Sequence, residues 1–279
     1  MSSQRILICT DLDRTLLPNG PQPESPGARD QFAALVARPE VSVAYVTGRH
    51  RSLVEQAIEE FSIPVPDFVI GDVGTSLYHP QAGDWRLDSG WQQRLAASWG
   101  GRDRQGIADE LGELSGLTLQ EPEKQGLFKL SWYTAPDWDR AAGLAQLEAR
   151  LQAIKVAATL IWSIDESTDT GLLDLLPKAA SKRLAIEFLI EQEQFDPART
   201  ICSGDSGNDL AMLTSPLPAV LVANATEAVR SEALALAREA GTAESLYLAR
   251  GGYQGMNGCY AAGILEGVAH FIPDFKLDG

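Results

Sequence analysis

Two aspartates, separated by one residue, end the first apolar segment of the chain, ILICTDLD (6–13). Open parallel sheets bind ligands at the carboxyl ends of their strands, so Asp11 and Asp13 are candidates for chemistry. Asp11 can act as a nucleophile that forms an aspartyl-phosphate, and Asp13 can protonate the leaving group and later activate water. For this pair alone, a structural role is an equally good interpretation, with Asp11 capping the next element and Asp13 in solvent.

A second acidic cluster, Asp205 and Asp209, follows another short apolar segment in TICSGDSGND (200–209). Four carboxylates in one pocket raise each other's pKa unless a cation lies between them. Ligands that offer only oxygen suit Mg²⁺. We therefore expect a Mg²⁺ site in which Asp11 and Asp205 bind the ion directly, whereas Asp209 supports these ligands through hydrogen bonds. For Asp209 the alternative is a charge that complements a helix dipole.

The elements that must position these residues alternate between strand and helix. Short apolar runs predict strands, and amphipathic stretches predict helices. The order predicts an α/β fold, a doubly wound parallel Rossmann-like core sheet with helices on both faces. The expected strands are 5–10, 41–46 and 199–203, and the expected helices are 25–36, with Ser25 as N-cap and Pro26 as first residue, 52–61, 181–191 and 257–271.

The middle of the chain interrupts that alternation. We expect a helix through Leu111, strands at 117–120 and 127–134, a helix at 137–151 and a strand at 157–162. Two consecutive strands between helices predict an inserted α+β cap domain with its own antiparallel sheet. The predicted core domain is therefore 1–80 with 172–279, and the predicted cap domain is 81–171.

Composition excludes several classes of partner. The chain has 279 residues and a formal net charge of −15, which disfavours nucleic acid and anionic membranes. We find no membrane-length apolar run and no signal-peptide layout, so we expect a cytoplasmic protein. The three cysteines, Cys9, Cys202 and Cys259, are too scattered for a disulfide framework and are expected in the core.

Four motifs appear in a fixed order: DLDRT, TGR, a lysine that opens a helix, and GDSGNDLAML. Together they resemble the haloacid dehalogenase (HAD) superfamily of phosphohydrolases, and the insertion resembles the large cap of its sugar-phosphate phosphatases. A closer resemblance is to sucrose-phosphate phosphatases and mannosylfructose-phosphate phosphatases. The segments that support it are PDFVIGDVGTSLYHP (66–80), LFKLSWY (127–133), DLLPKAASK (174–182), GDSGND (204–209) and GILEGVAHF (263–271).

This resemblance implies roles for further core residues. The main-chain carbonyl of Asp13 becomes a metal ligand, and Lys182 and Thr47 become catalytic residues that offset the charge of the phosphoryl group. Gly48 and Asn208 are expected in substrate binding. Arg49 has two open interpretations, a substrate contact and a salt bridge at a helix end.

Sugar specificity is expected in the cap, because the core recognises mainly phosphate. Lys129 aligns with a family lysine that touches the glycosyl unit. The segment DESTDTGLLDLLP (165–177) lacks the family's usual polar residues before its leucines, and Asp169 or Thr170 can substitute. Because of this departure, the resemblance does not decide whether the sugar is sucrose. Arg14 replaces the common small residue of the first motif. His79 is expected as a contact at the hinge into the cap, with a contact to substrate as the alternative.

The predicted function is Mg²⁺-dependent hydrolysis of a disaccharide phosphate, with sucrose 6-phosphate as the first choice. Mannosylfructose phosphate and glucosylglycerate phosphate are alternative substrates. A sugar phosphomutase would use the same aspartates, and a non-catalytic partner of a sucrose-phosphate synthase would more often have lost a motif residue. A synthase is also the possible protein partner of an active enzyme.

Overall fold

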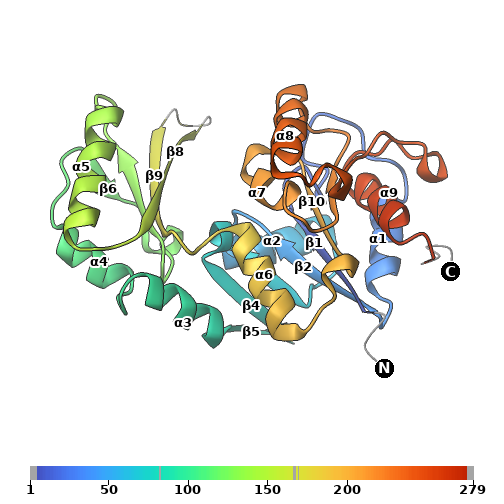
Figure 1. The fold of residues 1–279 in the computed structure, drawn as a ribbon, viewed down its shortest axis with the longest axis horizontal. Coiled ribbons are helices and arrows are strands. Elements are labelled where there is room, and N and C mark those ends of the chain that lie inside the picture. Colours follow the sequence, from blue (N-terminus) through green and yellow to red (C-terminus); the bar gives the residue numbers. More distant parts are fainter. Residues whose placement is uncertain (1–4, 82, 166–167, 169, 275–279) are drawn as a thin grey trace.

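The computed structural model describes residues 5–81, 83–165, 168 and 170–274, and the strands of these residues form two separate sheets (Figure 1). One sheet has eight strands in the order β12-β11-β10-β1-β2-β3-β4-β5, and the other has four in the order β6-β7-β9-β8. The large sheet forms the core of the molecule, and the small sheet belongs to the cap beside it. The predicted α/β core with an inserted α+β cap is confirmed.

The large sheet is mostly parallel. Its parallel strands are β1 (Ile6–Thr10), β2 (Val41–Val46), β3 (Phe68–Gly71), β10 (Thr200–Gly204), β11 (Ala219–Leu221) and β12 (Leu246–Leu248). An antiparallel hairpin of β4 (Ser76–Gln81) and β5 (Asp84–Leu87) completes one edge. This hairpin was not predicted, so the sheet is mixed rather than purely parallel.

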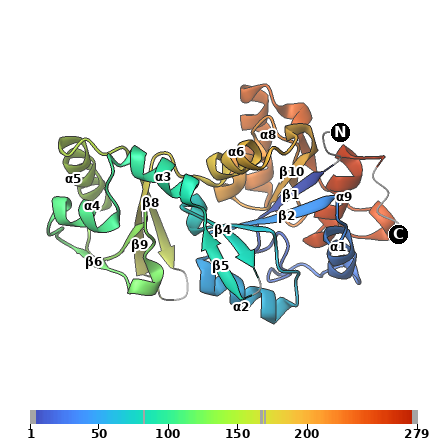
Figure 2. The same ribbon diagram turned by 90° about the horizontal axis from the view of Figure 1, so that it is seen from below.

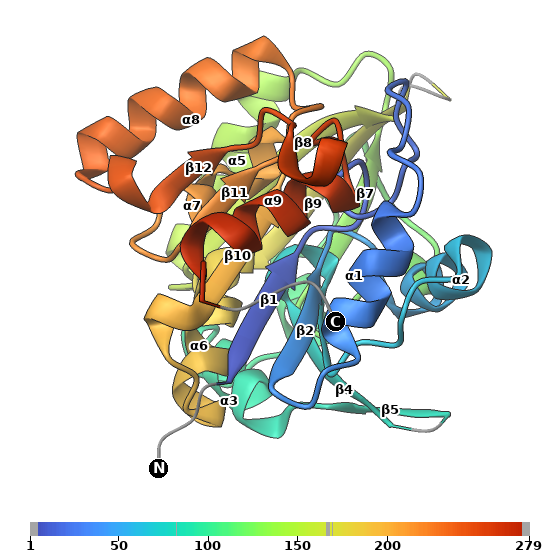
Figure 3. The same cartoon turned by 90° about the vertical axis from the view of Figure 1, so that its right-hand side faces the viewer.

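Helices cover both faces of the large sheet (Figure 3). Successive strand residues point to opposite faces, so Ile6 and Ile8 pack in one apolar cluster while Leu7 and Cys9 pack in the other. The first cluster includes residues of α1 (Ala28–Val36), α2 (Arg51–Phe61) and α9 (Ala261–Phe271). The second includes residues of α6 (Lys182–Glu193), α7 (Leu210–Leu213) and α8 (Glu227–Ala240). The three cysteines are free and buried, as expected.

The cap sheet is antiparallel and has helices packed against it (Figure 2). Its strands are β6 (Leu117–Leu119), β7 (Leu130–Thr134), β8 (Ala158–Asp165) and β9 (Thr170–Pro177), and the cap helices are α3 (Ser89–Ser98), α4 (Arg104–Leu111) and α5 (Arg140–Ala153). Leu147 and Leu151 of α5 are buried in one cluster with Leu173 and Leu175 of β9. Trp132, on β7, is buried in the same cluster.

The residues at which the chain passes from one sheet to the other indicate the domain boundaries. Residues 84–87 form β5 in the large sheet, whereas β9 continues in the small sheet to Pro177. We propose to move the boundaries of the cap from 81 and 171 to about 88 and 178. Asp88 lies at the first of these points, where its carboxylate lies 2.8 Å from His79 Nε2 and accepts hydrogen bonds from the Trp91 backbone amide and Gln192, also at 2.8 Å.

Three predicted helices differ from the structure, and one of them, expected at 257–271, begins only at Ala261 as α9. The helix expected through Leu111 is two helices, because Gly100 and Gly101 between them have φ values of 65° and 82°. Helix α1 begins at Ala28 after a Gly27 cap with φ of 76°, not at Ser25 and Pro26. The Ser25 hydroxyl instead donates to the Asn257 side chain at 2.8 Å.

Short 3₁₀ helices connect the larger elements: η1 (Asp72–Gly74), η2 (Pro122–Lys124), η3 (Pro197–Arg199), η4 (Gly207–Asp209), η5 (Ala243–Ser245) and η6 (Tyr253–Gly255). The glycine-rich segment 249–258 therefore forms loops and η6 ahead of α9. Within the described ranges, no helix combines the length and the apolar character needed to cross a bilayer.

Candidate active site

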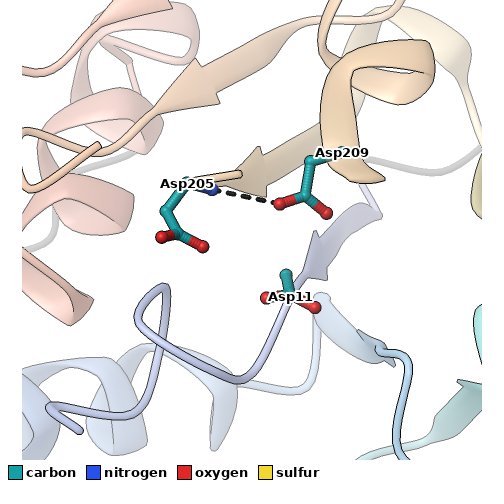
Figure 4. Close-up of side chains that lie close together, drawn as sticks. All are labelled: Asp11, Asp205 and Asp209. Atoms are coloured by element: carbon teal, nitrogen blue, oxygen red, sulfur yellow. Dashed lines mark hydrogen bonds between the residues drawn. The ribbon is translucent and has the colours of Figure 1, made fainter. Parts of the chain in front are cut away.

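Three buried aspartates converge at the carboxyl edge of the large sheet. Asp11 follows β1 and Asp205 follows β10, and these strands are parallel neighbours in which Thr10 pairs with Ser203. Asp209 belongs to η4, just beyond Asp205. One carboxylate oxygen from each aspartate lies within 4.8 Å of the others, and all three side chains point into the same space (Figure 4). The expected meeting of the two acidic clusters is therefore present.

The turn after β10 is fixed by Asp209. Its Oδ2 accepts hydrogen bonds from the backbone amides of Asp205 and Ser206, each at 3.1 Å, and from the Ser206 hydroxyl. The first of these bonds is drawn in Figure 4. A Cβ at Gly204 would lie 2.5 Å from the Asp209 Cβ, so this close approach requires glycine. Asp209 thus holds the loop with one oxygen and turns the other inward.

Lys182 places an ammonium group between the carboxylates. Its Nζ lies 2.7 Å from Oδ1 of both Asp11 and Asp209, and it donates to Asn208 Oδ1 at 3.2 Å. Lys182 is the first residue of α6, and Ser181 caps that helix by accepting from the Leu184 amide at 3.1 Å. The lysine was expected to open this helix, and it does.

A close approach from η1 holds the start of α6 in place. Gly74 has a φ of 94°, and a Cβ there would lie 2.3 Å from the Ser181 carbonyl carbon. Only glycine combines this backbone conformation with that contact. The η1 turn thus sets the position of the Lys182 side chain.

The electrostatics of the aspartates are dominated by burial. Burial raises the pKa of Asp11 even though Lys182 opposes it, and burial together with Asp209 raises the pKa of Asp205 to about 6. For Lys182, burial lowers the pKa, but the charges of Asp11 and Asp209 outweigh burial and raise it. Three carboxylates therefore surround one buried ammonium, and a further cation would relieve their repulsion.

The donor set fits a metal ion. Asp11, Asp205 and Asp209 offer only oxygen atoms, close enough together to bind one ion. Hard divalent cations prefer such ligands, and soft metals do not. The predicted metal site is thus compatible with the geometry of this cluster.

Asp13 lies beside the triad and is held by Arg49. The guanidinium donates to Oδ1 at 2.6 Å and to Oδ2 at 2.8 Å, and Asn19 adds a bond at 2.7 Å. Burial acts to raise the pKa of Asp13, but the bonds from Arg49 outweigh it and lower the pKa. Arg49 also donates to the Leu53 carbonyl in the first turn of α2, at 3.2 Å. Arg49 therefore forms a salt bridge just before the start of α2, with Asp13 as a partner that was not foreseen, and its contact with substrate stays a prediction.

Arg14 approaches the triad from the first loop. Its Nε lies 3.4 Å from Asp205 Oδ2, and its backbone has a φ of 57°, which favours residues such as glycine or asparagine. Asn224 donates to the Arg14 carbonyl at 2.6 Å and accepts from the Tyr260 amide at 2.9 Å. No sequence motif pointed to Asn224, because its role depends on the approach of three distant segments.

Thr47 and Gly48 follow β2, the neighbour of β1. Thr47 is fully buried, and its hydroxyl accepts from the Arg49 amide at 3.1 Å. The Thr47 backbone bonds to Ile70 and Val73, so the loop is tied to β3 and η1. Both residues therefore lie at the same edge of the sheet as Asp11.

The cap contributes Lys129 next to a pocket shared with the core. Its Nζ lies 3.7 Å from Asp72 Oδ1 and 3.8 Å from Asp174 Oδ2. The pocket measures about 490 Å³, and its lining includes His50, Ser52, Asp72, Thr75, Gln125 and Gly126. Asp72 was not singled out from the sequence. Asp169, the other predicted cap residue, lies outside the described residues.

A carboxylate pair just after one strand, a second acidic loop after the neighbouring strand, a buried lysine between them and an inserted cap are the arrangement of HAD-like phosphohydrolases. The chain belongs to the sucrose-6F-phosphate phosphohydrolase family, whose model matches residues 4–272. It is a phosphoric monoester hydrolase of the HAD family that acts on a sugar phosphate.

Individual relatives agree with this assignment. A HAD-like hydrolase of Nitrosococcus oceani is 50% identical over 274 residues, which cover 98% of this chain and 73% of the relative. The mannosylfructose-phosphate phosphatase of Agrobacterium fabrum is 34% identical over 78% of this chain and 83% of its own length. Sucrose-phosphatase 1 of Nicotiana tabacum is 29% identical over 97% of this chain but only 60% of its own length.

Solved structures share the fold. The sucrose-phosphatase from Synechocystis, determined with sucrose and phosphate, superimposes with a TM-score of 0.69 at 24% identity, covering 96% of this chain and 98% of that one. A HAD-like hydrolase from Bacillus subtilis gives a TM-score of 0.64 at 17% identity over 97% and 93% of the two chains. At these identities the likeness concerns the fold alone.

Proposed function

We propose that this protein is a Mg²⁺-dependent phosphatase that converts sucrose 6-phosphate to sucrose and inorganic phosphate. The observation that supports this choice most is the extent of the family match. The sucrose-6F-phosphate phosphohydrolase model spans residues 4–272, so it includes the cap as well as the core. Since specificity depends on the cap, a match there bears directly on the sugar.

In the proposed reaction Asp11 attacks phosphorus while the bond from phosphorus to the sugar oxygen breaks. Asp13 gives its proton to that oxygen, and sucrose leaves. Asp13 then takes a proton from a water molecule, whose oxygen attacks the aspartyl-phosphate, releasing phosphate and restoring Asp11. Lys182, 2.7 Å from Asp11, orients the nucleophile and offsets phosphoryl charge together with Thr47 and the amides of Leu12 and Gly48.

Asp11, Asp205 and the Asp13 carbonyl would hold Mg²⁺, which would supply positive charge opposite the phosphoryl oxygens. Asp209 supports this site through the turn that it holds, and Asn208 does so through its bond to Lys182. In this scheme Lys182 and a bound metal ion would together neutralise the negative charge of Asp11, Asp205 and Asp209.

Arg49 is proposed to exchange partners when substrate binds. Without substrate it keeps Asp13 ionised through two hydrogen bonds. A phosphoryl dianion is a stronger partner for a guanidinium than one carboxylate, so Arg49 turns toward it. Asp13 then loses the contact that lowers its pKa and can take up the proton that it later donates.

A second candidate substrate is mannosylfructose phosphate. The relative that carries this name is 34% identical to the chain, against 29% for the tobacco sucrose-phosphatase. In the cap, Lys129 is proposed to bind the glycosyl unit of either disaccharide, with Asp169 as a further predicted contact. The synthase partner and the cytoplasmic location stay predictions.

The test is release of inorganic phosphate from sucrose 6-phosphate, mannosylfructose phosphate, glucosylglycerate phosphate and hexose phosphates, with Mg²⁺ and with EDTA. We expect metal-dependent release with a strong preference for sucrose 6-phosphate. Asp11→Asn removes the nucleophile and should abolish release, whereas Asp30→Asn, an exposed aspartate on α1, should not. Preference for mannosylfructose phosphate would select the second candidate, and transfer within a sugar without phosphate release would indicate a mutase.

A further inference from the structure

Asp72 is a buried carboxylate at the boundary of core and cap that the proposed reaction does not use. It is 4% exposed and is the first residue of η1, directly after β3. Its φ is 50°, a conformation that aspartate, asparagine and glycine adopt more readily than other residues. Its backbone amide donates to the Arg49 carbonyl at 3.0 Å, so the residue is tied to the loop beside Asp13.

The contacts of Asp72 leave room for a ligand. Oδ2 accepts from the Ser76 hydroxyl at 3.2 Å, and Oδ1 faces Lys129 Nζ at 3.7 Å. The second distance is too long for a hydrogen bond, as is the 3.8 Å from Lys129 to Asp174. The Lys129 ammonium and Asp72 Oδ1 therefore lie close to each other but do not form a hydrogen bond, so both can still bond to a ligand.

A hydroxyl group suits this arrangement. It can accept a hydrogen bond from the Lys129 ammonium and donate one to Asp72 Oδ1 at the same time. Neither a phosphate nor another carboxylate can do both, since each would meet Asp72 as a like charge. The pair thus recognises a neutral polyol better than an anion.

Asp72 lies at a distance from Asp11 that a sugar phosphate can span. β3 is two strands away from β1, which corresponds to roughly 10 Å at the usual spacing of strands. A sugar whose phosphate lies at Asp11 can extend over this distance toward the cap. Asp72 lines the shared pocket on the core side, and the cap turn at Gly126 and Lys129 closes on it, with a Gly126 Cβ position 3.9 Å from the Thr75 hydroxyl.

We propose that Asp72 is a specificity-determining residue that accepts a hydrogen bond from a hydroxyl of the leaving sugar, while Lys129 donates to the same hydroxyl. This inference rests on the proposed function, because it requires a sugar phosphate as substrate. It assigns a sugar contact to the core, which otherwise recognises phosphate. A substrate without hydroxyls gains nothing from Asp72.

Two variants test the proposal without straining the backbone. Asp72→Asn keeps the shape but removes the charge, and Asp72→Gly removes the acceptor while tolerating the positive φ. Each is compared with wild type in kcat and KM for the preferred sugar phosphate and for 4-nitrophenyl phosphate, which has no sugar. Glu59→Gln, an exposed carboxylate on α2, is the matched control and should change neither substrate.

We expect Asp72→Gly to reduce kcat/KM for the sugar phosphate by about 10- to 100-fold, mainly through KM, and Asp72→Asn to reduce it less. Activity on 4-nitrophenyl phosphate should stay within about 2-fold. Equal losses on both substrates would mean a structural role for Asp72. No loss on either substrate would also overturn the proposal. If wild type hydrolyses 4-nitrophenyl phosphate but no sugar phosphate, the proposed function fails and this inference fails with it.

Discussion

Lys182 places one ammonium group among three buried carboxylates, and this imbalance defines the chemistry of the site. Removing a charged group from water is unfavourable unless opposite charges surround it. Lys182 reaches Asp11 and Asp209 at 2.7 Å, whereas the cation that pairs with Asp205 among the described residues is the partly exposed Arg14, at 3.4 Å, and the Thr15 hydroxyl donates to Asp205 at 3.3 Å. The carboxylate least well neutralised by the protein is thus the one proposed as a direct metal ligand.

Arg14 competes for that ligand. Arg14→Gln keeps a polar but shorter side chain and removes the positive charge beside Asp205, so Mg²⁺ should bind more easily. Because the arginine is partly exposed, we expect a modest 2- to 5-fold decrease in the Mg²⁺ concentration for half-maximal activity. A Mg²⁺ titration of activity measures it. Arg238→Gln on the exposed face of α8 is the control, and equal midpoints in all three proteins would refute the competition.

The role of Asp13 can be separated from that of Asp11 by the leaving group. A sugar alkoxide needs a proton to depart, whereas 4-nitrophenolate does not. Asp13→Asn should therefore lower kcat/KM, which reports formation of the aspartyl-phosphate, by about 10²- to 10⁴-fold with the sugar phosphate and far less with 4-nitrophenyl phosphate. Asp11→Asn should abolish both activities. Equal losses from Asp13→Asn on the two substrates would argue against an acid role.

At the level of elements, parallel strands bring residues from distant segments to one edge. The loops after β1, β2 and β10 meet there because these strands are neighbours that run in the same direction. The η1 turn after β3 adds a second function, since it supports Lys182 through Gly74 and lines the pocket through Asp72. One short turn therefore contacts both the phosphate end and the proposed sugar end of the site.

Gly74→Ala tests this support. The added Cβ would meet the Ser181 carbonyl carbon at 2.3 Å, so α6 must shift and move Lys182. We expect a loss of roughly 2–4 kcal/mol in the free energy of unfolding, together with a lower kcat. Urea unfolding and kinetics measure the two effects. Gly241→Ala is the matched control, because Gly241 also has a positive φ of 72° but nothing within 4 Å, and it should lose only about 1 kcal/mol.

The sequence was sufficient for elements that depend on local pattern. Buried parallel strands such as 41–46 are continuous apolar runs, and the motifs identified Asp11, Asp205 and Lys182 because their spacing follows strand ends and helix starts. The β4–β5 hairpin was missed because an edge hairpin has no such run, and β3, β9, β11 and β12 were not among the predicted strands either. Asp72 and the pairing of Arg49 with Asp13 depend on which segments approach each other in three dimensions.

At the level of the whole molecule, metal binding and stability are linked. Burial raises the pKa of Asp205 to about 6 and that of Asp11 to about 8, so without metal both favour the folded protein below about pH 4, and they lose that contribution as pH rises through about 6 and about 8, respectively. Metal binding requires the deprotonated forms and therefore strengthens over the same range.

The increase in Tm caused by Mg²⁺ should thus be small at pH 5 and larger at pH 7.5. Differential scanning fluorimetry with Mg²⁺ or EDTA across this range measures it. Asp205→Asn should remove most of the increase, whereas Asp30→Asn should keep it. An increase independent of pH would mean that these carboxylates do not bind the ion.

The insertion of the cap also affects how the chain folds. In the central strand pair, Leu7 of β1 pairs with Thr200 of β10, so the whole cap lies between two segments that must meet. Pairing of the cap strands involves much shorter separations, and local contacts form faster. During synthesis, a nascent chain that has emerged from the ribosome as far as about Lys178 can complete the cap sheet while its core sheet still lacks β10, β11 and β12. The apolar side chains of β1 must then wait for the last third of the protein, which makes the unfinished core a natural client for chaperones.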